Sequence, residues 1–174
     1  MNKTRRVVIT GLLVSVGLIL HYVEGMVPMA YIIPGARLGL ANIVSLIGMI
    51  IYGFGTGLLI LFLRILLGSL LAGTFMTINF YLSISGGFSG YLLMGLVYYT
   101  ARDKFSIIGI SVIGAVFHNL GQILTAYFII DNYGIFYYLP YLVLLAIPTG
   151  IGVGLVSYYS LQYLPGNFIR GELL

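Results

Sequence analysis

The chain consists of long apolar runs separated by very short polar breaks. Only 7% of its 174 residues are charged, against about 25% in a typical soluble domain. A transmembrane helix needs about 20 mostly apolar residues, so six helices with short loops would occupy the whole chain. The sequence therefore predicts an all-α fold, an integral membrane bundle of about six transmembrane helices in a single domain over residues 1–174. The predicted spans are residues 7–27, 38–52, 56–72, 80–100, 105–130 and 137–159.

Two neighbouring spans, 38–52 and 56–72, are short for a hydrocarbon layer about 30 Å thick. They are separated by Gly53-Phe54-Gly55, which is a signal for a tight turn. This pattern predicts a thinned or partly re-entrant region of the bundle.

Basic residues indicate the orientation, because they concentrate in short cytoplasmic loops. They occur at the N-terminus, in the 102–104 loop and in the C-terminal tail, so the net charge of +4 is a membrane signal rather than a nucleic-acid one. With six spans, all three segments fall on one side. We expect both termini in the cytoplasm, with residues 28–36, residues 73–79 and Asp131 outside. The first apolar run is long, lacks a clear cleavage site and precedes further spans, so we expect a retained first helix.

Glycine is unusually frequent, with 24 residues. In membrane helices, small residues spaced four apart allow close helix packing. Gly11 and Ser15 form such a pair on the first span, and Gly150, Gly152 and Gly154 lie on the last. Either these faces pack within the bundle, or one of them docks another membrane protein.

Ionisable groups inside the spans are rare and therefore informative. Arg64 lies near the middle of the third span and His118 near the middle of the fifth. Arg37 begins the second span on the outer side, and Glu24 ends the first span there. A charge near the bilayer centre costs at least about 2.5–3.5 kcal/mol, so Arg64 requires compensating partners.

Two interpretations of these groups remain open. In the first, Arg64 belongs to a structural network with helix carbonyls or Glu24. In the second, the polar groups line an outward-opening cavity for an anionic or polar-headed ligand, since an arginine fork suits carboxylate or phosphate. The candidate substrate-binding residues are Arg37, Arg64, His118, Asn119, Gln122, Asn42, Asn79 and Glu24.

The sequence offers little for catalysis. It has no cysteine, no cluster with metal-ligand spacing, and no nucleotide-binding or hydrolase motif. Asp103 and Asp131 are isolated and predicted on opposite sides of the membrane. We therefore expect a non-enzyme with no metal site and no intrinsic cofactor.

Three stretches carry a resemblance to a known family. They are IPGARLGLAN (33–42), LRILLGS (63–69) followed by GTF (73–75), and GAVFHNLGQ (114–122). Together they resemble the bacterial family called Gx transporter or heptaprenyl diphosphate synthase component I, over about residues 7–160. That family is similar to the substrate-binding S components of energy-coupling factor (ECF) transporters, which are six-helix vitamin-binding proteins.

The resemblance implies a substrate-binding subunit in the bacterial plasma membrane, with an outward cavity closed by residues 28–36. Its partners would be a transmembrane coupling subunit and two cytosolic ATPases. Gly11 and Ser15 would form the docking face, at the place where such families usually carry two alanines. The ligand would be a vitamin or cofactor precursor. Two alternatives remain: a membrane subunit of extracellular electron transfer that binds a flavin or quinone, and an accessory subunit in isoprenoid diphosphate synthesis.

Overall fold

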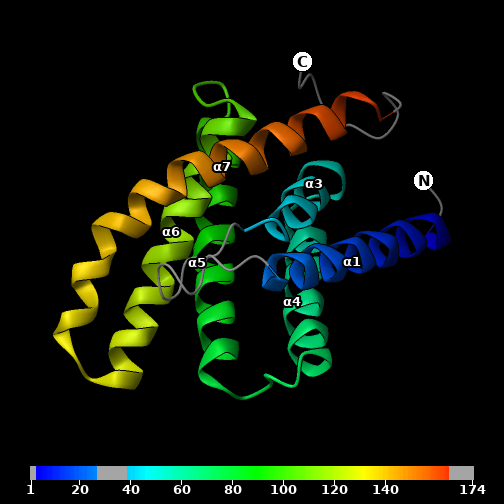
Figure 1. Ribbon diagram of the computed structural model, residues 1–174. Coiled ribbons are helices and arrows are strands. Elements are labelled where there is room, and N and C mark those ends of the chain that lie inside the picture. Colours follow the sequence, from blue (N-terminus) through cyan, green and yellow to red (C-terminus); the bar gives the residue numbers. More distant parts are fainter. Residues whose placement is uncertain (1–2, 27–38, 165–174) are drawn as a thin grey trace.

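The computed structural model describes residues 3–26 and 39–164, and it confirms the all-α membrane bundle (Figure 1). Five of its helical segments are long and apolar enough to cross a membrane, the last of them running from η1 into α7. The chain is therefore a multi-pass membrane protein. The elements are α1 (Lys3–Met26), α3 (Asn42–Tyr52), α4 (Phe54–Leu71), α5 (Ile78–Ala101), α6 (Ile107–Ile130), the 3-10 helix η1 (Tyr133–Tyr138) and α7 (Leu139–Gln162).

Helices α4, α5, α6 and α7 alternate in direction, whereas α1 lies across α4 (Figure 1). Figure 1 shows the α4–α5 and α6–α7 connections at one end of the bundle and the α5–α6 connection at the other. α5 and α6 pack along each other, as do α6 and α7. The 102–104 loop thus lies at the opposite end from residues 73–77 and Asp131, the separation that the predicted orientation requires.

The helix α3 departs from an ordinary span. It has 11 residues, which gives about 16 Å at the helical rise of about 1.5 Å per residue. The predicted span began at residue 38, outside the described residues, whereas the helix begins at Asn42 after a turn in which the Asn42 amide donates to the Gly39 carbonyl (2.8 Å). Every residue from Ile43 to Tyr52 is buried. α3 is therefore a short central helix, enclosed by α1, α4, α5 and α7.

Gly53 makes the reversal between α3 and α4. Its φ of 91° lies in the region that favours glycine. Its amide donates to the Met49 carbonyl (2.9 Å), and its own carbonyl accepts from the amides of Thr56 and Gly57. One residue therefore ends α3 and begins α4, as the predicted turn required.

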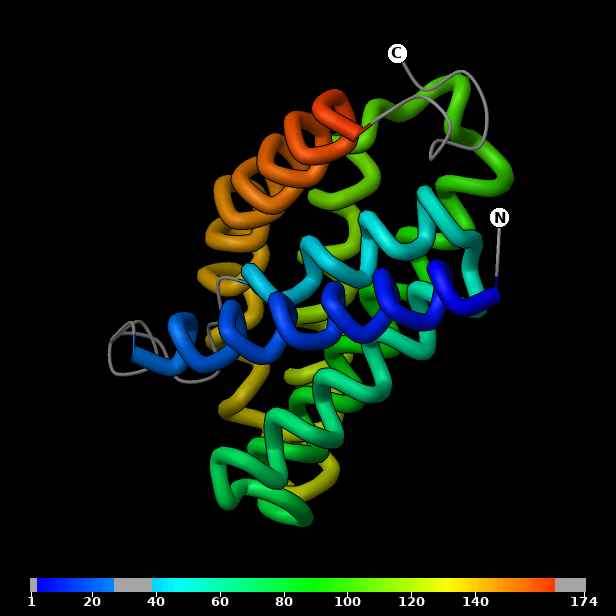
Figure 2. Tube along the Cα trace, turned by 90° about the vertical axis from the view of Figure 1, so that its right-hand side faces the viewer, coloured from blue at the N-terminus to red at the C-terminus, as the bar shows by residue number. Residues whose placement is uncertain are grey.

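The first helix lies on the outside of the bundle. Figure 2 shows α1 and α3 side by side and running in opposite directions, and α1 also packs on α4. Only Thr10, Val14 and Gly17 are buried within α1. Gly11 and Ser15 are exposed, and the Ser15 hydroxyl donates to the Gly11 carbonyl (3.0 Å). A side chain at Gly11 would meet no atom within 4 Å, so this glycine does not serve packing inside the described bundle.

Other glycines do bring helices together. A Cβ at Gly150 or Gly154 of α7 would lie 2.6 Å from the Cα of Val112 or Ile108 in α6. These contacts confirm close packing by small residues for this pair of helices. Pro148 lies inside α7, and Figure 1 shows that helix bending along its length. Proline lacks an amide hydrogen and clashes with the preceding turn, which explains the bend.

Candidate functional site

Arg64 projects from α4 into the protein and is 6% exposed. Its Nη2 donates to Oδ1 of Asn42 over 2.6 Å. Asn42 is the first residue of α3, so the positive end of that helix lies beside the guanidinium group. Two sources of positive potential therefore meet at the polar end of an otherwise apolar helix.

Glu24 lies on the same side of the bundle as this pair. Its Oε1 accepts a hydrogen bond from the amide of Gly39 over 2.5 Å. Gly39 has a φ of 71°, and the turn at that residue leads directly into α3. The carboxylate therefore connects α1 to the N-terminal end of α3.

A small polar cavity lies between these groups. Its volume is about 30 Å³. Elements α1, α3, α4, α5 and α6 all contribute to its walls. The residues that line this polar cavity are His21, Glu24, Gly39, Asn42, Arg64, Ile65, Ser69, Thr74, Ser83 and His118.

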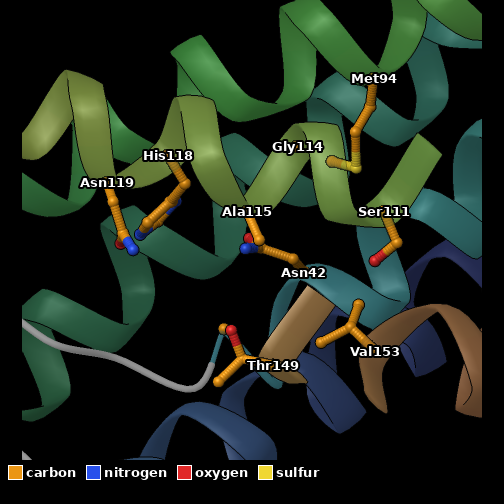
Figure 3. Close-up of a pocket in the computed structure, with 10 residues that line it drawn as sticks. Asn42, Met94, Ser111, Gly114, Ala115, His118, Asn119, Thr149 and Val153 are labelled. Carbon is orange, nitrogen blue, oxygen red and sulfur yellow. The ribbon is translucent and has the colours of Figure 1, made fainter. Parts of the chain in front are cut away.

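A second cavity, the α6–α7 cavity, adjoins the first and shares Gly39, Asn42 and His118 with it (Figure 3). Its volume is about 20 Å³. Figure 3 shows Ser111, Gly114, Ala115, His118 and Asn119 along α6, with Thr149 and Val153 facing them from α7. Because the two cavities share three lining residues, they lie next to each other, and together they are called the polar region.

Glycines of α5 create the room for His118. A Cβ at Gly86 would lie 2.9 Å from the His118 carbonyl, and one at Gly90 would lie 3.1 Å from the His118 Cβ. The four-residue spacing puts both glycines on one face of α5. The sequence thus allows α6 to approach α5 closely where its polar residues lie.

The predicted site residues fall into several groups. Arg64, Asn42, Glu24 and His118 line the polar cavity together. Asn119 lines only the α6–α7 cavity, and its Nδ2 donates to the Leu142 carbonyl of α7 over 2.8 Å.

Three predicted residues lie elsewhere. Gln122 is 3% exposed and packs against Gly86, and its Oε1 has no hydrogen-bond partner within the described residues. Asn79 is exposed near the start of α5, where its carbonyl accepts from the Ser83 hydroxyl (2.8 Å). Arg37 lies outside the described residues.

Several residues lining these cavities were not candidates from the sequence. His21 lies three residues before Glu24, one helical turn away, and that spacing was the available signal. Thr149 lines the α6–α7 cavity from the turn after Pro148. Serines and threonines are common in membrane helices, so their sequence positions alone did not mark Ser69, Ser111 or Thr149.

The size of these cavities restricts what they hold in this conformation. A cavity of about 10–15 Å³ accommodates one water molecule, whereas small-molecule sites usually measure about 300–1,000 Å³. The polar region therefore has room for ordered water. A vitamin-sized ligand would require the surrounding helices to separate. Within residues 3–26 and 39–164, no three histidine, cysteine or acidic side chains lie close enough to hold a metal ion.

Comparison with known proteins identifies the family of this chain. No curated protein and no solved structure shows significant similarity to the chain. The family model described as "Heptaprenyl diphosphate synthase component I" matches residues 13–160. The match covers most of the chain, including α3, α4 and α6 with Arg64 and His118. The chain therefore belongs to the heptaprenyl diphosphate synthase component I family.

Proposed function

We propose that this protein is the ligand-capture subunit of an ECF-type importer, which binds a vitamin or cofactor precursor with an anionic head group. The observation that carries the proposal is the polar region inside an apolar bundle. Arg64, Asn42 and His118 surround it, each from a different helix. Polar groups are expensive to hold within a membrane bundle, so such a convergence favours a binding role.

The charge balance of the region favours an anionic ligand. Arg64 and the N-terminal end of α3 supply positive potential. The facing carboxylate of Glu24 already accepts a hydrogen bond from the Gly39 amide. An arginine fork can hold a carboxylate or phosphate through two parallel hydrogen bonds. In this proposal Arg37 adds a second cation from the outer rim, and Asn119, Gln122 and Asn79 contribute as the site opens.

The importer would need subunits that this chain does not supply. Its sequence contains no nucleotide-binding motif, so the proposal assigns ATP hydrolysis to two cytosolic ATPases. A transmembrane coupling subunit would connect them to this protein. The chain itself would capture ligand without catalysing a reaction, in the plasma membrane of a bacterium.

A second candidate function is favoured by the family description, which names a component of a synthase. In that role the protein would be an accessory subunit in isoprenoid diphosphate synthesis. A diphosphate is also an anion joined to an apolar group, so the same polar region would suit it. Uptake that requires ATP and a coupling partner would support the importer, whereas association with a soluble synthase subunit would support this second role.

The ligand can be identified first, by native mass spectrometry of the purified protein with its copurified small molecule. A quinone would overturn the importer proposal in favour of a redox role, whereas riboflavin, a flavin that is itself a vitamin, would be consistent with import. Affinity for the identified molecule can then be followed by thermal stabilisation in detergent.

Arg64→Gln is expected to weaken binding of that molecule by about 1.5–3 kcal/mol, the range for hydrogen bonds to charged groups. Arg64→Lys should recover only part of the loss, because lysine lacks the fork. Arg102→Gln, on a partly exposed side chain of the 102–104 loop, is the matched control and should bind normally. An Arg64→Gln protein that binds normally and is merely less stable would show that Arg64 is structural.

The proposed orientation has its own test, because the chain contains no cysteine. Single cysteines at Asn2, Asp103 and Asp131 can be labelled with an impermeant maleimide in intact cells. We expect labelling at position 131 only, since basic segments favour the cytoplasm. Labelling at position 103 without labelling at 131 would reverse the orientation.

A further inference from the structure

A large apolar groove lies between the C-terminal halves of α1 and α4. Its volume is about 640 Å³, within the range of small-molecule sites. Nearly all of its lining is aliphatic, aromatic or glycine, and His21 is its one imidazole. Such a lining suits a hydrocarbon chain rather than a polar molecule.

The groove adjoins the polar cavity through one residue. His21 lines both spaces. A Cβ placed on Gly68 would lie 3.1 Å from Cδ2 of the His21 ring, so the ring packs directly against α4 at this point. Gly68 lies four residues after Arg64 and three before Leu71, which places all three on one stripe of α4. The stripe leads from the guanidinium group to the groove.

Helix α1 covers this stripe where it crosses α4, as Figure 1 shows. A Cβ at Gly17 would lie 3.4 Å from Cδ of Arg64, so α1 rests on the aliphatic part of that side chain. One turn further along α1, His21 lines both the polar cavity and the groove.

The groove opens to the outside of the bundle. Tyr22, Met26 and Leu71 line it and are 68%, 65% and 79% exposed. α1 and α4 are both long and apolar enough to span a membrane, so we expect this outer surface to face lipid. A hydrocarbon chain in the bilayer therefore has direct access to the groove.

We propose that the polar cavity and the adjoining groove together bind a membrane amphiphile. Its anionic head binds Arg64, and its apolar chain lies in the groove between α1 and α4. The ligand enters sideways from the bilayer, past His21. The inference rests on the proposed function only in assigning anion binding to Arg64. It adds a ligand class and a route of entry. An ordinary lipid covering the bundle would fill the groove regardless of its head group, and this difference defines the test.

The chain contains no tryptophan, so a single introduced tryptophan gives an unambiguous fluorescence signal. Leu71→Trp places the reporter in the groove, and Leu144→Trp places one on α7, at a residue that is 65% exposed and outside the groove. The probes are lysophosphatidic acid and lysophosphatidylcholine that carry the same mid-chain doxyl quencher. Both reporters are reconstituted in nanodiscs of zwitterionic lipid.

We expect the lysophosphatidic acid probe to quench the Leu71→Trp reporter with saturation, at about tenfold lower concentration than the lysophosphatidylcholine probe. The Leu144→Trp reporter should show no preference between the two. Adding Arg64→Gln should remove the preference at the groove, and Arg64→Lys should restore part of it.

Two glycine variants test the groove itself. A Cβ at Gly25, which lines the groove, would meet no atom within 4 Å, so Gly25→Leu narrows the groove without disturbing the packing. It should weaken saturable quenching. Gly152 of α7 has the same open surroundings, so Gly152→Leu is the matched control and should leave quenching unchanged.

Equal quenching by the two probes at the groove would identify ordinary boundary lipid and overturn the inference. If Arg64→Gln also leaves binding of the copurified molecule unchanged, the assignment of Arg64 in the proposed function fails with it. If that binding still depends on Arg64, the proposed function stands and only the amphiphile and its lateral route are wrong.

Discussion

Helices α1 and α3 lie side by side, and both are apolar, yet one is mostly exposed and the other is buried. α1 has 24 residues and exposes most of them, including Val8, Leu12 and Ile19. α3 has 11 residues and buries every one from Ile43 onward. Apolar composition alone therefore does not separate a helix that faces lipid from one that forms the core.

Their lengths, and the glycines at their contacts with α4, explain the difference. At about 16 Å, the helical part of this span covers only about half of a hydrocarbon layer about 30 Å thick, so at least one end of α3 must be satisfied inside the protein. A Cβ at Gly57 of α4 would lie 2.7 Å from the Ser45 carbonyl, which shows how closely the two backbones approach. α1 is long enough to cross the hydrocarbon layer, and at Gly11 it makes no close contact with another helix.

The largest expected effect is a difference in how much a substitution in each helix lowers the stability of the protein. Leu46→Ala in α3 removes a fully buried side chain and should lower the free energy of unfolding by about 2–5 kcal/mol, because a cavity remains. Leu12→Ala in α1, at a residue that is 60% exposed, is the matched control and should cost less than about 0.5 kcal/mol. Unfolding in mixed micelles measures both. Equal losses would contradict the central position of α3.

The sequence predicted the helical class and where the long helices lie, because uninterrupted apolar length is a direct signal. It did not predict that α3 is central. In a membrane protein both the lipid-facing and the protein-facing sides of a helix are apolar, so periodicity does not distinguish them. Burial of α3 depends on contacts with α4, α5 and α7 that are far apart in the sequence.

The candidate site was predictable where polar residues are rare. Arg64, His118, Asn42 and Glu24 stood out in apolar surroundings and line one cavity. Asn79 was also a candidate but lies exposed near the start of α5, beside the segment that the sequence already placed outside the spans. The position of a residue in the sequence indicates its depth along a helix. Whether that residue faces the interior of the bundle depends on tertiary packing.

A smaller effect should appear at the polar end of α3. Asn42→Ala removes the 2.6 Å hydrogen bond to Arg64 and should destabilise the protein by about 1.5–3 kcal/mol, the range for a bond to a charged group. Asn132→Ala removes an exposed bond to the Gly134 amide and serves as the control, with an expected cost of about 1 kcal/mol or less. Thermal unfolding in detergent compares the two variants. A cost no larger than that of the control would show that α3 does not anchor Arg64.

The smallest effect on stability is expected on the outer face of α1. Gly11→Leu adds a side chain where no atom lies within 4 Å, and it replaces a poor helix former with a good one. The isolated protein should therefore keep its stability to within about 1 kcal/mol. Under the proposed function this face meets the coupling subunit, and close approach of two membrane helices requires small residues at the contact.

Gly11→Leu should thus weaken copurification with the coupling subunit while leaving ligand binding intact, and Gly152→Leu, equally open on α7, should affect neither. Loss of ligand binding together with partner binding would indicate misfolding and count against docking at α1. Unchanged association would mean that the exposure of α1 serves lipid contact alone. In that case its contrast with α3 would reflect only the two kinds of apolar surroundings that a membrane protein offers its helices.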